Sequence, residues 1–271
     1  MAKPFLIGVA QARQSAHLGR NLRKIAEYLD RACARQLDLL VFPECALTGY
    51  GPAYYPAPDF DPDAIEAALA EVRGMVRASR TAVLIGAHLP RGTDWTNSLL
   101  CIRVDGRIAA RYDKVHLYGR DPDYYAAGDK PGPVVSVPGA RVGLQICFDI
   151  RFPEPFRRLA LSGARILAIP SFIHGRKDMW KGPVIEGHVR SRAAENGRFV
   201  VFANAAGPSQ NVPSMIADPR GELVAKAIRG AEELLVASLD LSRVNDDYLS
   251  LRREELYAPV PRKPGRSREK R

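Results

Sequence analysis

Short apolar runs alternate with segments of helical periodicity along most of this chain. Several of the runs are apolar on both faces, which is typical of strands in the centre of a sheet. Strands that alternate with helices predict an α/β fold, here one domain in which helices cover a large mixed sheet. The runs predicted to be strands span residues 5–11, 37–44, 81–89, 98–104, 141–147, 164–171, 198–204, 213–219 and 233–240.

Three of the intervening segments have a clear helical pattern. Apolar side chains recur at helical spacing between residues 22 and 33, which places Cys33 in the core. Residues 62–79 and 183–196 are predicted helices that open with a proline, which the first turn of a helix tolerates. The tetrapeptide VDGR at 104–107 predicts a hairpin between two strands.

The composition excludes a chain that is disordered throughout or embedded in a membrane. Hydrophobic residues make up 46% of the 271 residues, which is ordinary for a globular protein with a sizeable core. No apolar stretch approaches the roughly 20 residues of a membrane span, and the first residues lack the pattern of a secretory signal. The four cysteines show neither a CxxC pair nor a metal-binding spacing, so we expect reduced thiols and no metal. These features predict a cytoplasmic protein.

The net charge of +10 raises the question of a nucleic-acid partner. Residues 262–271 hold six basic residues and one acidic residue, so half of the excess lies in these ten residues. The rest of the chain has no basic stripe interleaved with aromatic residues, and we expect neither a nucleic-acid nor a membrane partner. Residues 1–261 are therefore predicted to form the domain and residues 262–271 a disordered basic tail. Docking of this tail on an acidic partner is the alternative.

Three reactive side chains lie at the ends of extended segments. In open α/β sheets, functional groups collect at the carboxyl ends of strands, where the loops diverge. Glu44 and Cys147 close two of the apolar runs, and Lys114 follows the extended segment RIAARYD. A cysteine at a turn between a strand and a helix faces backbone N–H groups, which favour the thiolate.

Together these three residue types suit acyl transfer. The cysteine would be the nucleophile, the carboxylate would take its proton, and the lysine would stabilise the thiolate and the oxyanion. A histidine could instead be the base, as in a papain-like pair. The candidates for that role are His88, His116, His174 and His188, of which the first two lie within or beside predicted strands.

Three segments, in this order, resemble the signature segments of the nitrilase superfamily of carbon–nitrogen hydrolases: VFPECALTGY, YDKVHLYGR and ICFDIRFPE. Two further segments, RSRAAENGRFVVFAN and SMIADPRGEL, extend the resemblance from the first strand to about residue 240. The resemblance implies a four-layer αββα sandwich that associates into a homodimer or a larger homo-oligomer. It also implies an enzyme that needs no cofactor.

The resemblance assigns catalytic roles to residues of this chain. Glu44 matches the general base, Lys114 the catalytic lysine and Cys147 the nucleophile. The backbone N–H of Phe148 would join Lys114 in stabilising the oxyanion. Structural roles, in ion pairing and turn geometry, are expected for Asp149, Arg151, Glu154, Glu195 and Asn196.

One position departs from the family pattern. Many members carry a second glutamate soon after the lysine, and its best counterpart in this chain is Asp121. Aspartate is one methylene shorter, so it reaches the site only if its loop moves inward. An accessory role for Asp121 in orienting Lys114 or a water is expected, and Asp123 is the competing candidate. Both could instead be simple turn carboxylates beside Pro122.

The implied reaction is hydrolysis of an amide or N-carbamoyl group of a small molecule. It proceeds through an acyl thioester on Cys147 and releases ammonia. Loops at 50–60, 118–125 and 171–183 supply aromatic and cationic side chains that could wall a pocket. The predicted substrate contacts are Tyr50, Tyr54, Tyr124, Arg176 and Trp180, and Arg176 with Lys177 suggests a carboxylate on the substrate.

Other functions remain open on the same residues. The chain could hydrolyse nitriles, transfer the acyl group to an amine, or be a catalytically silent binding module. The presence of all three catalytic residue types argues against the silent module, because binding alone does not need them. Release of ammonia in water without an added acceptor would distinguish a hydrolase from a transferase.

Overall fold

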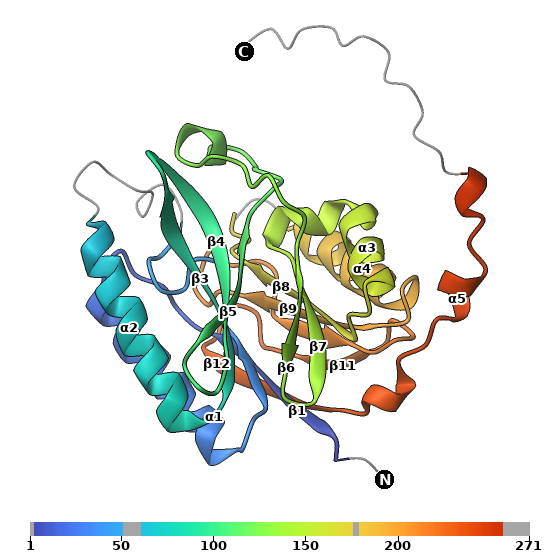
Figure 1. Ribbon diagram of the computed structural model, residues 1–271, viewed down its shortest axis with the longest axis horizontal. Helices are drawn as coiled ribbons and strands as arrows, with labels where there is room; N and C mark the ends of the chain where they lie inside the picture. Colours follow the sequence, from blue (N-terminus) through green and yellow to red (C-terminus); the bar gives the residue numbers. More distant parts are fainter. Residues whose placement is uncertain (1–2, 51–60, 176–178, 257–271) are drawn as a thin grey trace, which may run out of the picture.

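Two six-stranded sheets pack face to face, and a pair of helices covers each outer face (Figure 1). The computed structural model describes residues 3–50, 61–175 and 179–256. Each sheet contains three adjacent parallel strands that are separated in sequence by helices. The four-layer sandwich is therefore confirmed, whereas the prediction of a single mixed sheet, made from the apolar runs, was wrong.

The first sheet has the strand order β12-β1-β2-β3-β4-β5. Its parallel centre is extended by antiparallel neighbours, β12 beside β1 and the β3–β4–β5 meander on the other side. The predicted hairpin is present, because Gly106 at φ +77° donates its N–H to the carbonyl of Arg103 at 2.7 Å. The strands are β1 (Phe5–Gln11), β2 (Leu39–Val41), β3 (Ala82–Arg91), β4 (Asp94–Ile102), β5 (Ile108–Asp113) and β12 (Glu233–Leu239).

The second sheet has the order β11-β10-β9-β8-β7-β6. Its centre, β7 to β9, is parallel, and the remaining pairs are antiparallel. The two edge strands, β6 and β11, have four residues each and were not predicted. The strands are β6 (Val134–Val137), β7 (Ala140–Leu144), β8 (Ile166–Ser171), β9 (Phe199–Asn204), β10 (Met215–Ala217) and β11 (Leu223–Lys226).

Three apolar layers hold the sandwich together. The central layer, between the sheets, includes Ile7, Leu84, Val142 and Ile166, all of which are fully buried. The outer layers seat α1 (Leu18–Ala34) and α2 (Pro62–Ser79) on the first sheet, and α3 (Pro153–Leu161) and α4 (Lys181–Ala194) on the second. Each buried side chain of this size contributes about 1.5–3 kcal/mol to folding, so the layers fix the sheets relative to each other.

The buried face of α1 does not include Cys33, which is exposed, contrary to prediction. Ile25, Tyr28, Leu29 and Ala32 form the stripe that contacts the first sheet. Cys33 comes one residue after the end of this stripe and therefore lies about 100° around the helix from Ala32. Helical periodicity located the helix correctly, but the width of its apolar face was overestimated by one position.

Short helical turns complete the fold, two of which carry residues of the site described below. These are η1 (Asp121–Asp123) and η2 (Cys147–Arg151), and near the end of the chain lie η3 (Leu241–Arg243), α5 (Asp247–Ser250) and η4 (Glu254–Leu256). Within the described residues, none of the helices is long and apolar enough to cross a membrane. The predicted tail, residues 262–271, lies outside the described residues.

Candidate active site

Glu44, Lys114 and Cys147 meet at one end of the sandwich, although they come from different strands. Glu44 follows β2, Lys114 follows β5 directly, and Cys147 begins η2 three residues after the end of β7. The predicted strand at 141–147 is therefore shorter than expected, and Cys147 lies in the turn that follows it. The Lys114 Nζ lies 2.8 Å from Glu44 Oε1, and the Cys147 thiol also interacts with the Glu44 carboxylate.

The turn that carries Cys147 has a strained backbone. Cys147 has a φ of +45°, a conformation that costs a residue other than glycine on the order of 1–3 kcal/mol. The buried Asp149 holds the turn in place, because its Oδ2 accepts the N–H of Ile146 at 2.9 Å and the hydroxyl of Tyr112 at 2.7 Å. Its Oδ1 lies 2.7 Å from His116 Nδ1, so Asp149 has the structural role expected for it. The thiol is thus held at a fixed position.

The Glu44 carboxylate is buried and its two oxygens have different surroundings. Oε1 accepts hydrogen bonds from Lys114 Nζ and from Asn97 Nδ2, both at 2.8 Å. Oε2 has no hydrogen-bond partner of ordinary geometry in the described part of the chain. The Cys147 thiol interacts with this carboxylate. Since Asn97 and Lys114 occupy Oε1, Oε2 is the oxygen available to take the thiol proton.

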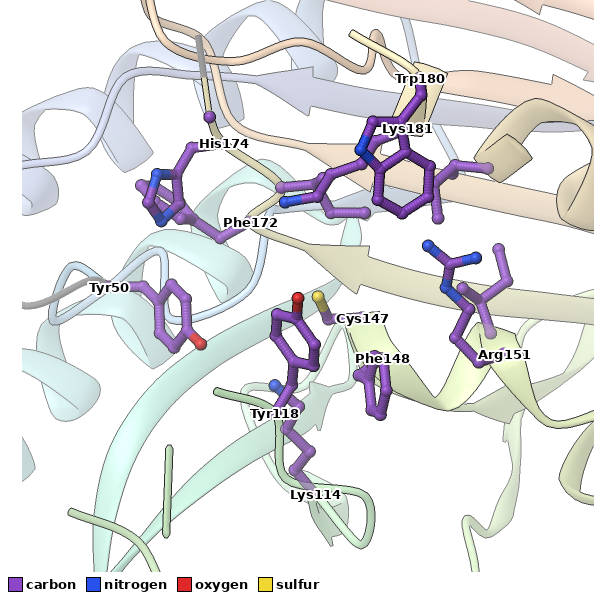
Figure 2. A pocket seen from close by; sticks show the side chains of 14 residues that line it. Tyr50, Lys114, Tyr118, Cys147, Phe148, Arg151, Phe172, His174, Trp180 and Lys181 are labelled. Carbon is purple, nitrogen blue, oxygen red and sulfur yellow. The ribbon is translucent and has the colours of Figure 1, made fainter. Parts of the chain in front are cut away.

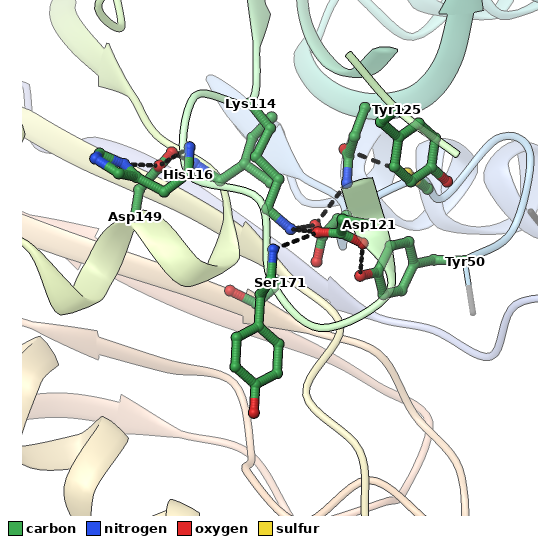
Figure 3. A network of polar contacts seen from close by, with 12 residues as sticks. Tyr50, Lys114, His116, Asp121, Tyr125, Asp149 and Ser171 are labelled. Carbon is green, nitrogen blue, oxygen red and sulfur yellow. Dashed lines mark hydrogen bonds and ion pairs between the residues drawn. The ribbon is translucent and has the colours of Figure 1, made fainter. Parts of the chain in front are cut away.

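Asp121, rather than Asp123, lies beside the lysine. Its Oδ2 is 2.9 Å from Lys114 Nζ, and its Oδ1 accepts the hydroxyl of Tyr50 at 2.6 Å (Figure 3). The N–H of Tyr118 also donates to Asp121, at 3.1 Å. Asp123 lies on the outer side of η1, where it pairs with Arg120 at 3.2 Å and is largely exposed. The shorter aspartate therefore reaches the lysine because η1 brings its backbone inward.

Burial and mutual charge shift the pKa values of the three central groups. Burial raises the pKa of Glu44, and the charge of Lys114 opposes this effect. Burial and the Glu44 carboxylate raise the pKa of the Cys147 thiol, against the charge of Lys114 and a hydrogen bond from the backbone of Phe172. Burial lowers the pKa of Lys114, but Glu44, Cys147 and Asp121 outweigh it and raise the pKa well above the ordinary value. The resting site thus holds a protonated thiol and a charged lysine.

A cavity of about 550 Å³ opens over the Cys147 sulfur. Figure 2 shows the sulfur at its centre, with Tyr118 and Phe148 on one side, Phe172 on another, and Trp180 near Arg151. The walls are mainly aromatic and aliphatic, and Lys114, Arg151 and Lys181 supply positive charge. The remaining lining residues are Tyr50, Ile150, Ile173, His174, Gly175 and Ile185.

The predicted substrate contacts are only partly placed in this cavity. Tyr50 and Trp180 line it. Tyr124 is not among its described lining residues, and its hydroxyl accepts a hydrogen bond from Arg120 at 2.7 Å. Tyr54 and Arg176 lie outside the described residues. Tyr118 and Phe172 were missed, although both belong to loops whose aromatic content marked them as possible walls.

The histidines have other partners than the nucleophile. His88 Nε2 lies 2.8 Å from the hydroxyl of Tyr125, and burial lowers the pKa of His88 to about 3. His116 contacts Asp149 and stacks on Phe152, and His188 lies 3.2 Å from Arg151. His174 lines the cavity, but it is the Glu44 carboxylate that interacts with the thiol. Within the described ranges no group of three His, Cys, Asp or Glu side chains could hold a metal ion.

A thiol and a buried lysine that line a cavity, with a buried carboxylate in contact with both, define a class of thiol-dependent hydrolases on an αββα sandwich. The chain belongs to the carbon–nitrogen hydrolase family, whose model matches residues 6–247. This match covers both sheets and every residue of the site described above.

Relatives and solved structures agree with this assignment. An (R)-stereoselective amidase of a Pseudomonas species is 33% identical over 93% of this chain and 91% of the relative. The human omega-amidase NIT2 is 28% identical, with coverage of 96% and 99%. The crystal structure of an amidase from a Nesterenkonia species superposes with a TM-score of 0.82 at 27% identity, covering 95% of this chain and 96% of that one. A variant of the Nesterenkonia enzyme carries the acetamide moiety of fluoroacetamide on its active-site cysteine.

Proposed function

We propose that this protein hydrolyses the carboxamide of a small molecule, through an acyl thioester on Cys147 and with release of ammonia. The observation that carries the proposal is the buried Glu44 carboxylate, which is joined to Lys114 at 2.8 Å and interacts with the Cys147 thiol. A base, a cation and a nucleophile in direct contact are the parts that acyl transfer requires.

In the first half-reaction, Glu44 takes the thiol proton as the sulfur attacks the amide carbon. The raised pKa of Glu44 makes its carboxylate a stronger base than an exposed glutamate, so the proton moves readily as the new bond forms. The negative charge passes from the sulfur to the substrate oxygen. Lys114 and the backbone N–H of Phe148, both on the cavity wall, are our candidates for stabilising this oxyanion.

Collapse of the tetrahedral intermediate breaks the C–N bond. Glu44 returns the proton to the leaving nitrogen, which departs as ammonia, and the acyl group remains on the sulfur. In the second half-reaction Glu44 takes a proton from water, and the hydroxide attacks the thioester carbon. The C–S bond then breaks to release the acid, and Glu44 returns the proton to the Cys147 sulfur. Asp121 keeps Lys114 in place throughout, because its Oδ2 lies 2.9 Å from the Lys114 ammonium.

The cavity favours a substrate with an apolar body and an anionic end. Ile150, Ile173, Ile185 and the aromatic walls suit the body, and Arg151 and Lys181 offer charge for a carboxylate. The names of the relatives support an amide over other groups, since amidases are prominent among them, although one relative is a nitrilase of Pyrococcus abyssi. N-carbamoyl compounds and nitriles are the alternatives to be tested.

The test is ammonia release from a panel of aliphatic amides, ω-amides of dicarboxylic acids, N-carbamoyl amino acids and nitriles. We expect an amide to be hydrolysed and Cys147→Ala to be inactive but folded. Cys33→Ala is the control, because Cys33 is an exposed thiol of α1 outside the site and should be dispensable for turnover. Undiminished hydrolysis by Cys147→Ala would end the assignment of the nucleophile, and acyl transfer only to an added amine would indicate a transferase.

The surroundings of the enzyme are also part of the proposal. We propose a homo-oligomer that acts on a small molecule in the cytoplasm, without a nucleic-acid or membrane partner. The four free cysteines support a reducing compartment. Light scattering during gel filtration measures the oligomer, and an observed monomer would contradict this part of the proposal.

A further inference from the structure

Asn97 contacts both the proposed base and the proposed lysine, yet none of the steps above uses it. This residue lies in β4 and is 1% exposed. Its Nδ2 donates to Glu44 Oε1 at 2.8 Å, and its backbone carbonyl accepts the N–H of Lys114 at 2.8 Å. It is absent from the described lining of the cavity, so it acts on the reaction only through other residues.

The orientation of the Asn97 amide is set by Cys45. The Cys45 thiol donates to Asn97 Oδ1 at 3.3 Å, which leaves Nδ2 directed at Glu44. A flipped amide would place Oδ1 against the Glu44 oxygen and would leave two acceptors in contact without a proton. Burial raises the pKa of Cys45 well above its ordinary value, so the thiol remains a donor across the whole working range of pH.

The backbone around Cys45 is shaped to present this thiol. Cys45 has a φ of +51° and is completely buried. Gly86 of β3 lies against it so closely that a Cβ at that position would be 2.3 Å from the Cys45 nitrogen. Leu47 N donates to the carbonyl of Gly86 at 3.0 Å, which fixes the turn after Glu44 on β3. The Glu44 carboxylate is therefore supported by three residues, Asn97, Cys45 and Gly86, of which Cys45 contacts the other two.

We propose that Asn97 is a positioning residue that directs Glu44 Oε1 away from the nucleophile, and that the Cys45 thiol fixes the orientation of its amide. The inference rests on the proposed role of Glu44 as the base. With Oε1 occupied by Asn97 and Lys114, the thiol proton is left to Oε2. Loss of the Asn97 donor leaves Oε1 held by Lys114 alone and removes a hydrogen bond that favours the charged carboxylate.

The pH dependence of the reaction gives the direction of the effect. Glu44 acts as a base only when ionised, so kcat/KM falls on the acid side as Glu44 becomes protonated. Removing a hydrogen bond to the carboxylate raises the pKa of Glu44, and the acid limb moves to higher pH. The charged or titratable groups that face Glu44 are Lys114, Asp121, Cys147, Cys45 and Tyr50. All five stay in place in Asn97→Ala, and the Cys45 variants replace only Cys45.

The experiment measures two pH profiles, kcat/KM for the amide substrate and the rate of Cys147 alkylation by iodoacetamide, in a Cys33→Ser background. For Asn97→Ala we expect kcat to fall about 10- to 100-fold, the range typical of supporting residues. KM should change little and the acid limb should shift to higher pH in both profiles. Cys45→Ala should shift it in the same direction by less, and Cys45→Ser, which keeps a donor, should restore the profile of the parent.

Asn196→Ala is the matched control, because Asn196 is a buried asparagine whose Nδ2 bonds Arg192 in α4. It should lower the melting temperature without moving the acid limb. An unmoved limb in folded Asn97→Ala, or the same profile for Cys45→Ala and Cys45→Ser, would overturn the inference. If Asn97→Ala does not fold, the Cys45 pair decides. If no amide is hydrolysed, the proposed function fails, but the alkylation profiles still test the positioning of Glu44.

Discussion

Replacing Asp121 with asparagine tests the electrostatics of the site without changing its shape. The asparagine oxygen can accept from Lys114 and from the N–H of Tyr118, as Oδ2 of Asp121 does now. Its NH₂ group then faces the hydroxyl of Tyr50, which can turn to accept it. The variant should therefore fold, and any change in rate reports the loss of one negative charge.

The size of the effect follows from the position of Lys114. Its Nζ is 2.8 Å from Glu44 Oε1 and 2.9 Å from Asp121 Oδ2, so these two oxygens lie within about 6 Å of each other. At an effective dielectric constant of about 20, two unit charges at this distance repel by about 3 kcal/mol. That energy corresponds to about a hundredfold in the protonation equilibrium of Glu44. The charge of Asp121 raises the pKa of Glu44, so Asp121→Asn should lower it.

The assay is the pH profile of kcat/KM together with single-turnover kinetics. We expect the acid limb to move to lower pH, opposite to the shift in Asn97→Ala, because Glu44 becomes a weaker base. At neutral pH kcat should fall about 10- to 100-fold, and intact-mass spectrometry should show an acyl thioester on Cys147 during turnover. Asp123→Asn is the control and should match the parent. A limb that stays in place or moves to higher pH would refute the electrostatic reasoning.

Three further predictions concern Lys114, two glycines and the cysteines. Lys114→Met leaves two carboxylates without their cation and should lower the free energy of unfolding by about 3–5 kcal/mol. Urea unfolding should show a smaller loss at pH 5 than at pH 7, because protonation of a carboxylate relieves the repulsion between the two. In the parent, the raised pKa of Lys114 keeps the stabilising charge of the lysine at both pH values. Gly86→Ala forces a Cβ against the Cys45 backbone and should lower both activity and melting temperature, whereas Gly74→Ala, where a Cβ meets only a side chain at 3.7 Å in α2, should stabilise by about 0.5–1 kcal/mol. Iodoacetamide should label exposed Cys33 in the native protein, and peptide mapping should find label on Cys45 and Cys101 only after unfolding; early label on either buried thiol would contradict the packing described.

Much of the site could be predicted from the sequence because its chemistry is local. Glu44, Lys114 and Cys147 each follow an extended segment, and the ends of neighbouring strands meet at one edge of a sheet. Asp121 was a candidate only through the family pattern, and the choice over Asp123 needed the turn η1, which buries one and exposes the other. A strand pattern shows which faces are apolar, but not which strands pair, so two sheets were read as one.

Other features had no local signal. Asn97 lies between Thr96 and Ser98 in the polar first half of β4, and only the pairing of β3 with β4 and the turn after β2 place it against Glu44. Cys45 follows Glu44 in the sequence, yet its role depends on a positive φ and on Gly86. Tyr124 was predicted to contact the substrate because aromatic residues cluster near it, but its neighbour Tyr118 lines the cavity instead. The aromatic content of a loop predicts that the loop borders the cavity, but it does not predict which of its side chains point into the cavity.

The site is divided between the two sheets. Glu44 and Lys114 are carried by strands of the first sheet, and Cys147 and Phe172 by strands of the second. Hydrogen bonds from the Glu44 N–H to the Ser171 carbonyl at 3.4 Å and from the Tyr112 hydroxyl to Asp149 at 2.7 Å span the division. Together with the thickness of the central core, they set the distance between the base and the thiol. A displacement of about 1 Å can cost about a hundredfold in rate. A conservative substitution at Val142 or Leu84 would thus change the spacing of the sheets and with it the rate of turnover. Selection for a faster enzyme would then act on aliphatic core residues that do not contact the substrate.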